Sequence, residues 1–404
     1  MEYSCAFGID VSKASMNVAI LINKHQVDAV ILPMNQRGFS SLKAKLASFK
    51  QPIVVFEATG IYSRRLKFFL DSQKINYVYL NPLRAKKQLD KLRSFKSDQV
   101  DAFRLAETQF ILSRKPSYKM DPAYQELMDM SRFYQELVKD SIAHKNRLHR
   151  VLQLTFPELE QVESQPSGNL YWYLVEHYAN PQKVCQTSPD QILNSIPDQV
   201  KKSFFLSNQR LSRIIERLVK LARQAFPVVT EHSYVYHQIS YLARQLKTEN
   251  QVKNKIIKQM IQLAKDFKEY DELLSIPGFG KETVVSLIGE LGDLRRFRSS
   301  NALNAFVGID LRHYESGNYV AADRISKRGN PIARKILFKS IQSIASAAHY
   351  HPNHINDFYQ KRKKQSPSSS GTKKIAIAAM HRLLRTMYHL VKYDHFYDYD
   401  IARS

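Results

Sequence analysis

Short apolar runs and helical apolar stripes alternate along the first part of the chain. Three runs, CAFGIDV, MNVAILI and VDAVILPM, follow one another with turn-like breaks between them and predict three consecutive strands. IVVF at 53–56 and INYVYL at 75–80 predict two more buried strands. Helical spacing occurs at 38–49, 62–70 and 97–112. Three strands followed by alternating helices and strands are typical of a ribonuclease-H-like sheet, so residues 1–114 are predicted to form an α/β domain.

Between residues 115 and 270 the pattern changes to long amphipathic stretches, and glycine occurs only at position 168. SNQRLSRIIERLVKLARQAF and YHQISYLARQLKTENQVKNKIIKQMIQLAKDF carry apolar stripes separated by charged residues. This pattern predicts long paired helices or a coiled coil. A stretch that precedes them, SQPSGNLYWYLVEHYANPQKVCQTSPDQILNSIPDQV, contains the only tryptophan and is interpreted as an irregular insert.

Residues 271–404 are predicted to form a third, mainly helical unit. ELLSIPGFGKETVVSLIGELGDLRRF predicts short helices around a Gly-Phe-Gly turn, with Lys281 beside it. This is either a helix-hairpin-helix-like element that offers backbone N–H groups to a phosphate or an ordinary tight turn. The basic, serine-rich stretch KRKKQSPSSSGTKK at 361–374 is expected to be flexible, and KIAIAAMHRLLRTMYHLVK predicts a last helix.

The charge of the chain indicates a class of partner. There are 61 Lys and Arg residues against 37 Asp and Glu, for a formal net charge of +24 and a pI near 9.8. Such an excess favours nucleic acid. A membrane surface is the rival, but no apolar run approaches the ~20 residues that span a bilayer, and no secretory signal is found at the start. Two cysteines exclude a disulfide framework or a Cys-rich zinc site, so we expect a cytoplasmic protein.

Four acidic residues are candidates for metal binding. Asp10 and Glu57 each end a predicted strand, and Asp98 and Asp101 are spaced i, i+3 on one face of a predicted helix. Phosphoryl-transfer enzymes use such carboxylates to hold two metal ions, and hard oxygen ligands suit Mg²⁺ or Mn²⁺ better than zinc. Taken singly, each acid is also explained as a cap, a turn or a solvated residue. A basic stretch before the last pair suits a nucleic-acid backbone, and its candidate contacts are Arg84, Lys86, Lys87 and Lys96.

Successive short motifs carry a resemblance to a known family. GIDVSK, FEATGIY, NPLRAKKQ and KSDQVDAFRLAE resemble those of the DEDD transposases of bacterial insertion sequences, the one-ten insertion-sequence family, which is related to the Piv DNA invertases. SIPGFGKETVVSLIGELGDLRRFRSSNALNAFVGI and RHYESGNYVAADRISKRGNPIARKIL resemble the family's C-terminal transposase domain, which begins with a helix-hairpin-helix-like segment. The resemblance implies a RuvC-like N-terminal domain. It also implies that the metal-binding acids are Asp10, Glu57, Asp98 and Asp101.

The second of these C-terminal stretches resembles the block that carries the family's nucleophilic serine, and the match assigns this role to Ser316. Without the resemblance Ser316 reads as a turn serine beside a glycine, and Ser326, Tyr314 and Tyr319 are the competing nucleophiles. A serine hydroxyl needs a base, a metal or a positive field before it attacks phosphorus, and the transition state needs positive charge around it. Candidates for that charge, or for non-specific backbone contacts, are Arg324, Lys327, Arg328 and Arg334.

The resemblance implies a transposase that cuts and rejoins donor and target double-stranded DNA through a covalent 5′-phosphoserine intermediate. It also implies a composite site, in which the acids of one protomer lie next to the serine of another in a dimer or tetramer, and a structured non-coding bridge RNA as the guide. The alternatives are a Piv-like site-specific invertase, a RuvC-like metal-dependent nuclease that uses water, and a non-enzymatic nucleic-acid-binding protein. We expect action on the nucleoid in the bacterial cytoplasm.

Overall fold

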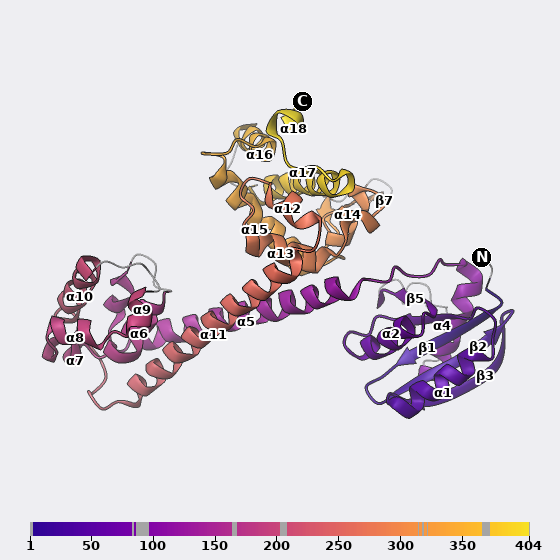
Figure 1. Ribbon diagram of the computed structural model, residues 1–404, viewed down its shortest axis with the longest axis horizontal. Helices are drawn as coiled ribbons and strands as arrows, with labels where there is room; N and C mark the ends of the chain where they lie inside the picture. Colours follow the sequence, from indigo (N-terminus) through magenta and orange to yellow (C-terminus); the bar gives the residue numbers. More distant parts are fainter. Residues whose placement is uncertain are drawn as a thin grey trace. The chain divides into compact units, whose positions relative to one another are not determined.

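The chain folds into two compact units, Met1–Lys119 and Met120–Ser404 (Figure 1). The computed structural model describes residues 3–82, 85, 97–163, 168–202, 208–313, 315–316, 319–320, 322–365 and 372–403.

A five-stranded sheet forms the centre of the first unit. Its strands are β1 (Cys5–Val11), β2 (Ser15–Ile22), β3 (His25–Pro33), β4 (Ile53–Glu57) and β5 (Asn76–Leu80). Their order is β3-β2-β1-β4-β5. The first three are antiparallel neighbours, whereas β4 pairs parallel to β1 and β5 parallel to β4. All five strands predicted from the apolar runs are confirmed.

Local turns explain this mixture of directions. Asn23 and Lys24 have φ angles of 47° and 73°, which both central residues of a type I′ hairpin turn require, and they join β2 to β3. In the β1–β2 turn, the Ser12 N–H and hydroxyl both donate to the carbonyl of Ser15 at 2.9 Å. Parallel strands need a longer crossover, and helices supply it before β4 and β5.

Helices cover both faces of the sheet. They are α1 (Gln36–Ala47), α2 (Tyr62–Ser72) and α4 (Asp98–Leu112). Leu42 of α1 and Leu66 of α2 belong to one core cluster with Phe7 of β1. Leu105 of α4 belongs to a second cluster, together with Val55 of β4, on the opposite face. The mixed α/β character predicted for this part of the chain is confirmed.

Gly8 of β1 allows α4 to lie directly on the sheet. A Cβ atom at this position would lie 1.9 Å from the carbonyl oxygen of Ala102 and 2.6 Å from the nitrogen of Ala106. Backbone atoms cannot yield to such an overlap without moving the helix, so the contact requires glycine. The small side chains of Ala102 and Ala106 complete the close approach.

Two long helices, α5 (Pro122–Leu152) and α11 (Tyr234–Ala264), lie side by side in the second unit (Figure 1). A buried polar cluster joins them. Glu249 of α11 accepts a hydrogen bond from the Ser141 hydroxyl at 2.7 Å and contacts the His144 ring nitrogen at 2.6 Å. Lys253 donates to the same Ser141 hydroxyl at 3.1 Å. A long helix over the second predicted stretch is confirmed as α11, but its partner is α5 of the same chain, whereas the first predicted stretch forms a helix that packs elsewhere, in residues 208–222.

From residue 168 onward the stretch interpreted as an irregular insert is mainly helical, which corrects that interpretation; residues 164–167 lie outside the described residues. It belongs to a helical cap, residues 157–222, made of η1 (Pro157–Gln161), α6 (Asn169–Tyr178), α7 (Pro181–Gln186), α8 (Pro189–Ser195), α9 (Asp198–Lys202) and α10 (Asn208–Ala222). Trp172, 2% exposed, is part of the core of this cap. The interpretation failed because the helices are short and α6 is apolar on all sides, so no amphipathic period marks it. Local signals were present, since Ser188 and Gln191 form a capping box.

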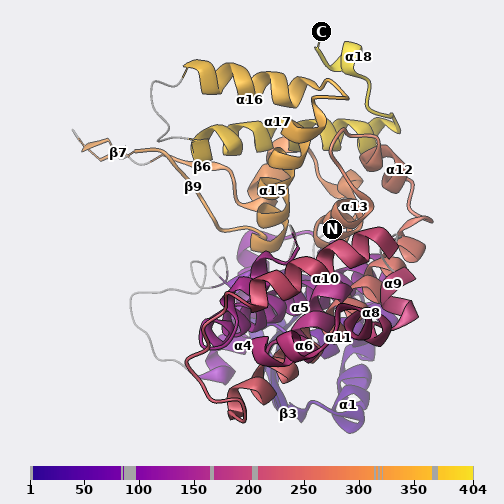
Figure 2. The same cartoon turned by 90° about the vertical axis from the view of Figure 1, so that its left-hand side faces the viewer.

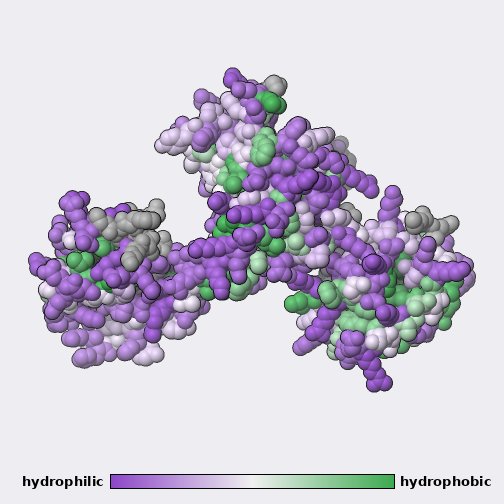
Figure 3. Space-filling model, in the orientation of Figure 1, coloured by the Kyte–Doolittle hydropathy of each residue, from purple (hydrophilic) through white to green (hydrophobic). Residues whose placement is uncertain are grey.

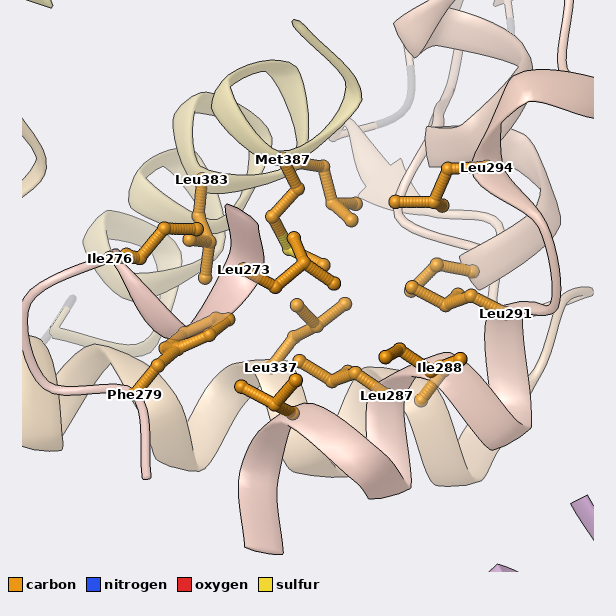
Figure 4. Close-up of a cluster of buried hydrophobic side chains, with 14 of the residues drawn as sticks. Leu273, Ile276, Phe279, Leu287, Ile288, Leu291, Leu294, Leu337, Leu383 and Met387 are labelled. Atoms are coloured by element: carbon orange, nitrogen blue, oxygen red, sulfur yellow. The ribbon is translucent and has the colours of Figure 1, made fainter. Parts of the chain in front are cut away.

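The rest of the second unit surrounds another hydrophobic core. Leu287, Leu337 and Leu383 come from three different helices and converge there (Figure 4). The elements are α12 (Glu269–Leu274), α13 (Lys281–Leu291), η2 (Leu294–Arg296), α14 (Ser300–Val307), β6 (Leu311–Arg312), β7 (Glu315–Ser316), β8 (Tyr319–Val320), β9 (Arg324–Ile325), α15 (Pro331–Ala347), α16 (His354–Gln365), α17 (Thr372–Tyr393) and α18 (Tyr399–Arg403). No helix within the described ranges has the length and apolar character that crossing a membrane requires.

The basic stretch expected to be flexible is in part helical. Residues 361–365 end α16 and residues 372–374 begin α17, while 366–371 lie outside the described residues. The guanidinium groups of Arg362 and Arg382 lie 5.5 Å and 4.7 Å from the ring centre of Phe358. The Arg382 contact joins α17 to α16, whereas the Arg362 contact lies within α16, one turn from Phe358.

Replacing Gly8 with alanine should loosen α4. The added methyl group overlaps backbone atoms of Ala102, and we expect a local loss of about 1–3 kcal/mol, as for other overpacked sites. Hydrogen exchange of the α4 amides in the full chain measures it. Gly280→Ala is the control, because a Cβ there meets no atom within 4 Å. Unchanged protection of α4 in Gly8→Ala would contradict the contact.

Candidate active site

Asp10 and Glu57 lie on neighbouring strands at the same end of the sheet. In the parallel pairing of β1 with β4, Ile9 is opposite Phe56, so the next residues on each strand are Asp10 and Glu57. Side chains alternate between the faces of a strand. Asp10 therefore shares the face of Gly8, and Glu57 shares the face of Val55, which is the face that α4 covers. Both acids are half-buried.

The two remaining acids begin the sheet-facing side of α4. Asp98 and Asp101 continue, one turn earlier, the row of Ala102 and Leu105 that packs on the sheet. Ser97 caps the helix by accepting a hydrogen bond from the Val100 N–H at 3.3 Å, which confirms the predicted cap.

Helix α4 runs in the direction that places Asp98 and Asp101 toward the end of the sheet where β1 carries Asp10 and β4 carries Glu57. A cavity is lined by Gln109 and Ser113 from the end of α4 together with Tyr3 and Ser4, which precede β1. The helix therefore runs antiparallel to β1, and its first turn lies toward Asp10. Four carboxylates from three elements thus share one edge, although only Asp10 and Glu57 are near in register.

The donor chemistry of this edge fits Mg²⁺ or Mn²⁺, because all four side chains offer hard oxygen ligands. Within the described residues, no three His, Cys, Asp or Glu side chains are close enough together to hold a metal ion. The shared edge is the structural finding, and the role of each acid as a ligand stays a prediction.

Ser316 lies on a projecting arm, residues 311–325, which we call the serine arm (Figure 2). Its base is the antiparallel pair of β6 and β9, where Leu311 is opposite Ile325. Its outer part is the pair of β7 and β8, where Ser316 is opposite Tyr319. The Ser316 and Tyr319 side chains, and the whole of Tyr314 and Gly317, lie outside the described residues. The stretch that reads as a turn is therefore a hairpin.

A close backbone crossing anchors the arm. A Cβ on Gly308, which has a φ of 79°, would lie 2.5 Å from the Gly329 nitrogen, so the end of α14 and the segment before α15 meet at two glycines. The Arg334 guanidinium donates to the Val307 carbonyl at 2.8 Å across this crossing. Ser326, a competing nucleophile, donates its hydroxyl proton to the Asp310 carboxylate.

The predicted phosphate contacts differ in their surroundings. Arg324, Lys327 and Arg328 are exposed beside the serine arm, whereas Arg334 is half-buried and holds the glycine crossing. Lys281 is the exposed first residue of α13. The N-cap residue before it, Gly280, has no side chain that could cap the helix. The other four basic candidates, Arg84, Lys86, Lys87 and Lys96, lie outside the described residues.

His313 is a residue of this arm that the sequence reasoning missed. Its Nδ1 lies 2.9 Å from an Asp323 carboxylate oxygen and its Nε2 lies 2.6 Å from Glu315, so it bridges the outgoing and returning sides of the arm. Hydrogen bonds to Asp323 and then Glu315 raise the pKa of His313 above its ordinary value. The sequence did contain a signal. Glu315 follows His313 by two residues, and Asp323 is near enough along the chain to face it across a hairpin.

Comparison with known proteins gives the family. A model for DEDD transposases of the IS110 type, described as Transposase, matches residues 7–157. A second model, described as Transposase IS116/IS110/IS902 family, matches residues 270–360. Together the matches cover more than half of the 404 residues, and the chain belongs to the IS110 family of transposases. Residues 158–269 fall between the two matches.

Individual relatives agree with this assignment. The chain is 35% identical over 82 residues to the transposase for insertion sequence element IS1111A of Coxiella burnetii, which is 20% of this chain and 22% of the relative. It is 31% identical over 128 residues to the pilin gene-inverting protein of Moraxella bovis, or 31% and 38% of the two chains. It is 33% identical over 104 residues to the transposase for insertion sequence element IS1328 of Yersinia enterocolitica, or 24% and 31%. The matches therefore span well under half the length of these relatives.

Protonation of His313 should strengthen its contacts with Asp323 and Glu315, which join the two sides of the serine arm. Because the pKa is raised in the folded chain, these contacts are fully present below the ordinary value near 6.5 and are lost as the pH rises through the raised pKa. Titration of the imidazole by NMR should give a pKa that falls toward the ordinary value in Asp323→Asn. Signals of the other histidines, unchanged between the two proteins, are the internal control. An unaltered His313 titration would show that the bridge is not formed in solution.

Proposed function

We propose that the protein is a DNA recombinase of an insertion sequence that cuts and rejoins donor and target double-stranded DNA. The observation that carries the proposal is that Asp10, Glu57 and the first turn of α4 lie toward one edge of the sheet. Family membership and a serine on a projecting arm, within a matched C-terminal block, add to it. An acidic edge alone would also serve a hydrolase, so the serine is the feature that separates the two activities.

The topology supports the further proposal that the first unit is RuvC-like. Three antiparallel strands followed by two parallel ones, with β1 in the middle, agree with the strand order expected of a ribonuclease-H fold and support this proposal. In this arrangement the central strand ends in an acid, here Asp10, and the neighbouring strand brings a second one, Glu57. Backbone pairing of β1 with β4 places these two carboxylates on adjacent strands at the same end of the sheet.

The proposed chemistry is a pair of phosphoryl transfers. In the first, the Ser316 hydroxyl oxygen attacks the scissile phosphorus, an O–P bond to serine forms, and the bond to the 3′ oxygen breaks. The 3′ oxygen takes up a proton as serine loses one, and the 5′ phosphate stays on Ser316. In the second, a 3′ hydroxyl of another DNA end attacks that phosphate and releases the serine. Bonds made and broken balance, so no external energy source is needed.

The residues around these steps have separate proposed tasks. Asp10, Glu57, Asp98 and Asp101 would hold divalent metal, Mg²⁺ or Mn²⁺, which supplies Lewis-acid stabilisation of the attacking and leaving oxygens. Exposed Arg324, Lys327 and Arg328 offer positive charge to the phosphate that Ser316 attacks. Arg334 is assigned a positioning role, because its guanidinium holds the crossing at the base of the arm.

RNA guidance and an oligomer complete the proposal. The net charge of +24 suits a protein that carries both DNA and a structured bridge RNA, with base pairing reading the sequence while the protein holds backbones. The acids and Ser316 belong to different units of the chain. A dimer or tetramer could then combine the acids of one copy with the serine arm of another.

Site-specific inversion is the second candidate function. The observation that favours it is the similarity, over 31% of this chain, to a protein named for inverting a pilin gene. Inversion and insertion use the same bond exchanges, so the difference lies in how the DNA sites are arranged. A substrate that carries two sites in inverted orientation on one molecule distinguishes the two outcomes.

Ser316→Ala should abolish a covalent protein–DNA adduct while binding of DNA persists. The hydroxyl is the attacking group in the proposal, so adduct formation should fall by at least about 10³-fold. Purified protein, Mg²⁺, donor DNA and RNA from the flanking region are combined, and the adduct is measured on a denaturing gel. Samples without RNA test guidance in the same experiment.

Ser326→Ala is the matched control, because this serine lies ten residues away in the same block and should not be needed for the adduct. Cleaved DNA with no adduct, produced equally by wild type and Ser316→Ala, would instead identify a RuvC-like hydrolase. An adduct that survives Ser316→Ala but is lost in Ser326→Ala would move the nucleophile to Ser326.

Loss of an acid should weaken metal binding directly. Asp10→Asn and Asp101→Asn each remove a hard anionic oxygen ligand, and we expect the affinity for Mn²⁺ to fall about tenfold or more. Isothermal titration with Mn²⁺ measures this without DNA or catalysis. Asp71→Asn, whose carboxylate pairs with Lys67 on α2, is the control. Equal Mn²⁺ affinity in all these proteins would remove the metal from the proposal.

A further inference from the structure

One face of α10 in the helical cap is strongly basic. Arg213, Arg217 and Lys220 are spaced i, i+4 and i+7, and Arg210 continues the row one turn earlier. All four side chains are exposed, and Glu216 is the only acidic residue of the helix. Within the described part of the chain, Arg213, Arg217 and Lys220 make no ion pair. Glu216 lies one turn from both Arg213 and Lys220 on this exposed face, so four cationic side chains share the face with one carboxylate.

The opposite face of α10 is fixed in the core of the cap. Leu211, Ile215 and Leu218 are at most 1% exposed and pack with the cluster that contains Trp172. The basic row is therefore presented by a rigid support. This burial also separates α10 from a membrane-surface helix, which needs its apolar face free to enter the lipid.

Exposed aromatic side chains follow the basic row. Phe226 exposes 86% of its surface and Tyr234 exposes 80%, in the connection between α10 and α11 and at the first residue of α11. The Tyr234 ring lies 5.6 Å from that of His237. Aromatic rings are costly to leave in water and bind the faces of unpaired bases well. The cap thus joins a cationic row to aromatic surfaces within a short stretch of chain.

We propose that α10 and the connection after it bind a single-stranded nucleic acid, with phosphates along the basic row and bases stacked on Phe226 and Tyr234. The row from Arg210 to Lys220 is about 15 Å long at about 1.5 Å per residue. A duplex would hide its base faces and leave the two aromatic rings without a partner.

This surface lies outside both family-matched segments, 7–157 and 270–360. The inference rests on the proposed function, because that function supplies nucleic acid as the partner. It goes beyond it by assigning a second contact, separate from the acidic edge and the serine arm. Figure 3 shows the mainly hydrophilic surface of the cap on the side in view.

Binding of the full chain to labelled 20-nucleotide RNA and DNA single strands, and to a DNA duplex, tests the proposal. The measurements are made in EDTA, so that catalysis does not affect them. Arg213→Gln/Arg217→Gln/Lys220→Gln should raise Kd for single strands about tenfold at 0.1 M salt and reduce the slope of log Kd against log salt by about 2. Phe226→Ser should raise Kd for single strands at least about fivefold, with a smaller effect on the duplex.

Three exposed lysines elsewhere provide the matched control, Lys255→Gln/Lys258→Gln/Lys265→Gln. A thermal unfolding curve that matches wild type shows that the cap is intact in each variant. Unchanged single-strand binding in the α10 variant, or an equal loss in the control, would overturn the proposal while leaving the recombinase function standing. An equal loss on the duplex would overturn the single-strand assignment. Comparison of the RNA and DNA strands identifies which of the two the cap prefers.

Discussion

The contact between Gly8 and the backbone of α4 is the constraint on which the acidic edge depends. Two carboxylates reach the edge through strand pairing alone, because Asp10 and Glu57 follow paired residues of β1 and β4. The other two arrive only because α4 lies so close to the sheet that a Cβ at Gly8 would overlap the Ala102 carbonyl. Hydrogen bonding within a sheet and steric contact between a helix and a strand are both rigid, so the edge is held by backbone rather than by side chains.

A second backbone contact has the same role for the serine arm. Gly308 and Gly329 bring the end of α14 against the start of α15, and the Arg334 guanidinium spans them by donating to Val307. The arm itself has little packing, and its sides are joined by two short strand pairs and the His313 bridge. The base of the arm is therefore fixed by backbone contacts, and the part beyond it is held by fewer contacts. Arg334 therefore has a structural contact at the base of the arm, whereas Arg324, Lys327 and Arg328 are exposed.

The acidic edge, the serine arm and the cap lie in different parts of the chain. The family matches cover the acidic edge and the serine arm, and the cap lies between them in sequence, on the long pair of α5 and α11. A buried Glu249 with Ser141 and His144 fixes the register of that pair, since a shift would leave the carboxylate without partners.

The sequence by itself determined the strands, the long helices and the family. Strong periodicity and Ser97 as a cap are local signals, and the motifs around the acids and Ser316 are short enough to read directly. The short helices around Trp172 were missed because the continuous apolar run 170–175 covers every side of α6 and leaves no amphipathic period. Only the tertiary structure decided the facing of Asp10 and Glu57, the structural role of Arg334 and the bridge at His313. Each of these depends on residues far apart in the chain meeting in space, which local pattern does not encode.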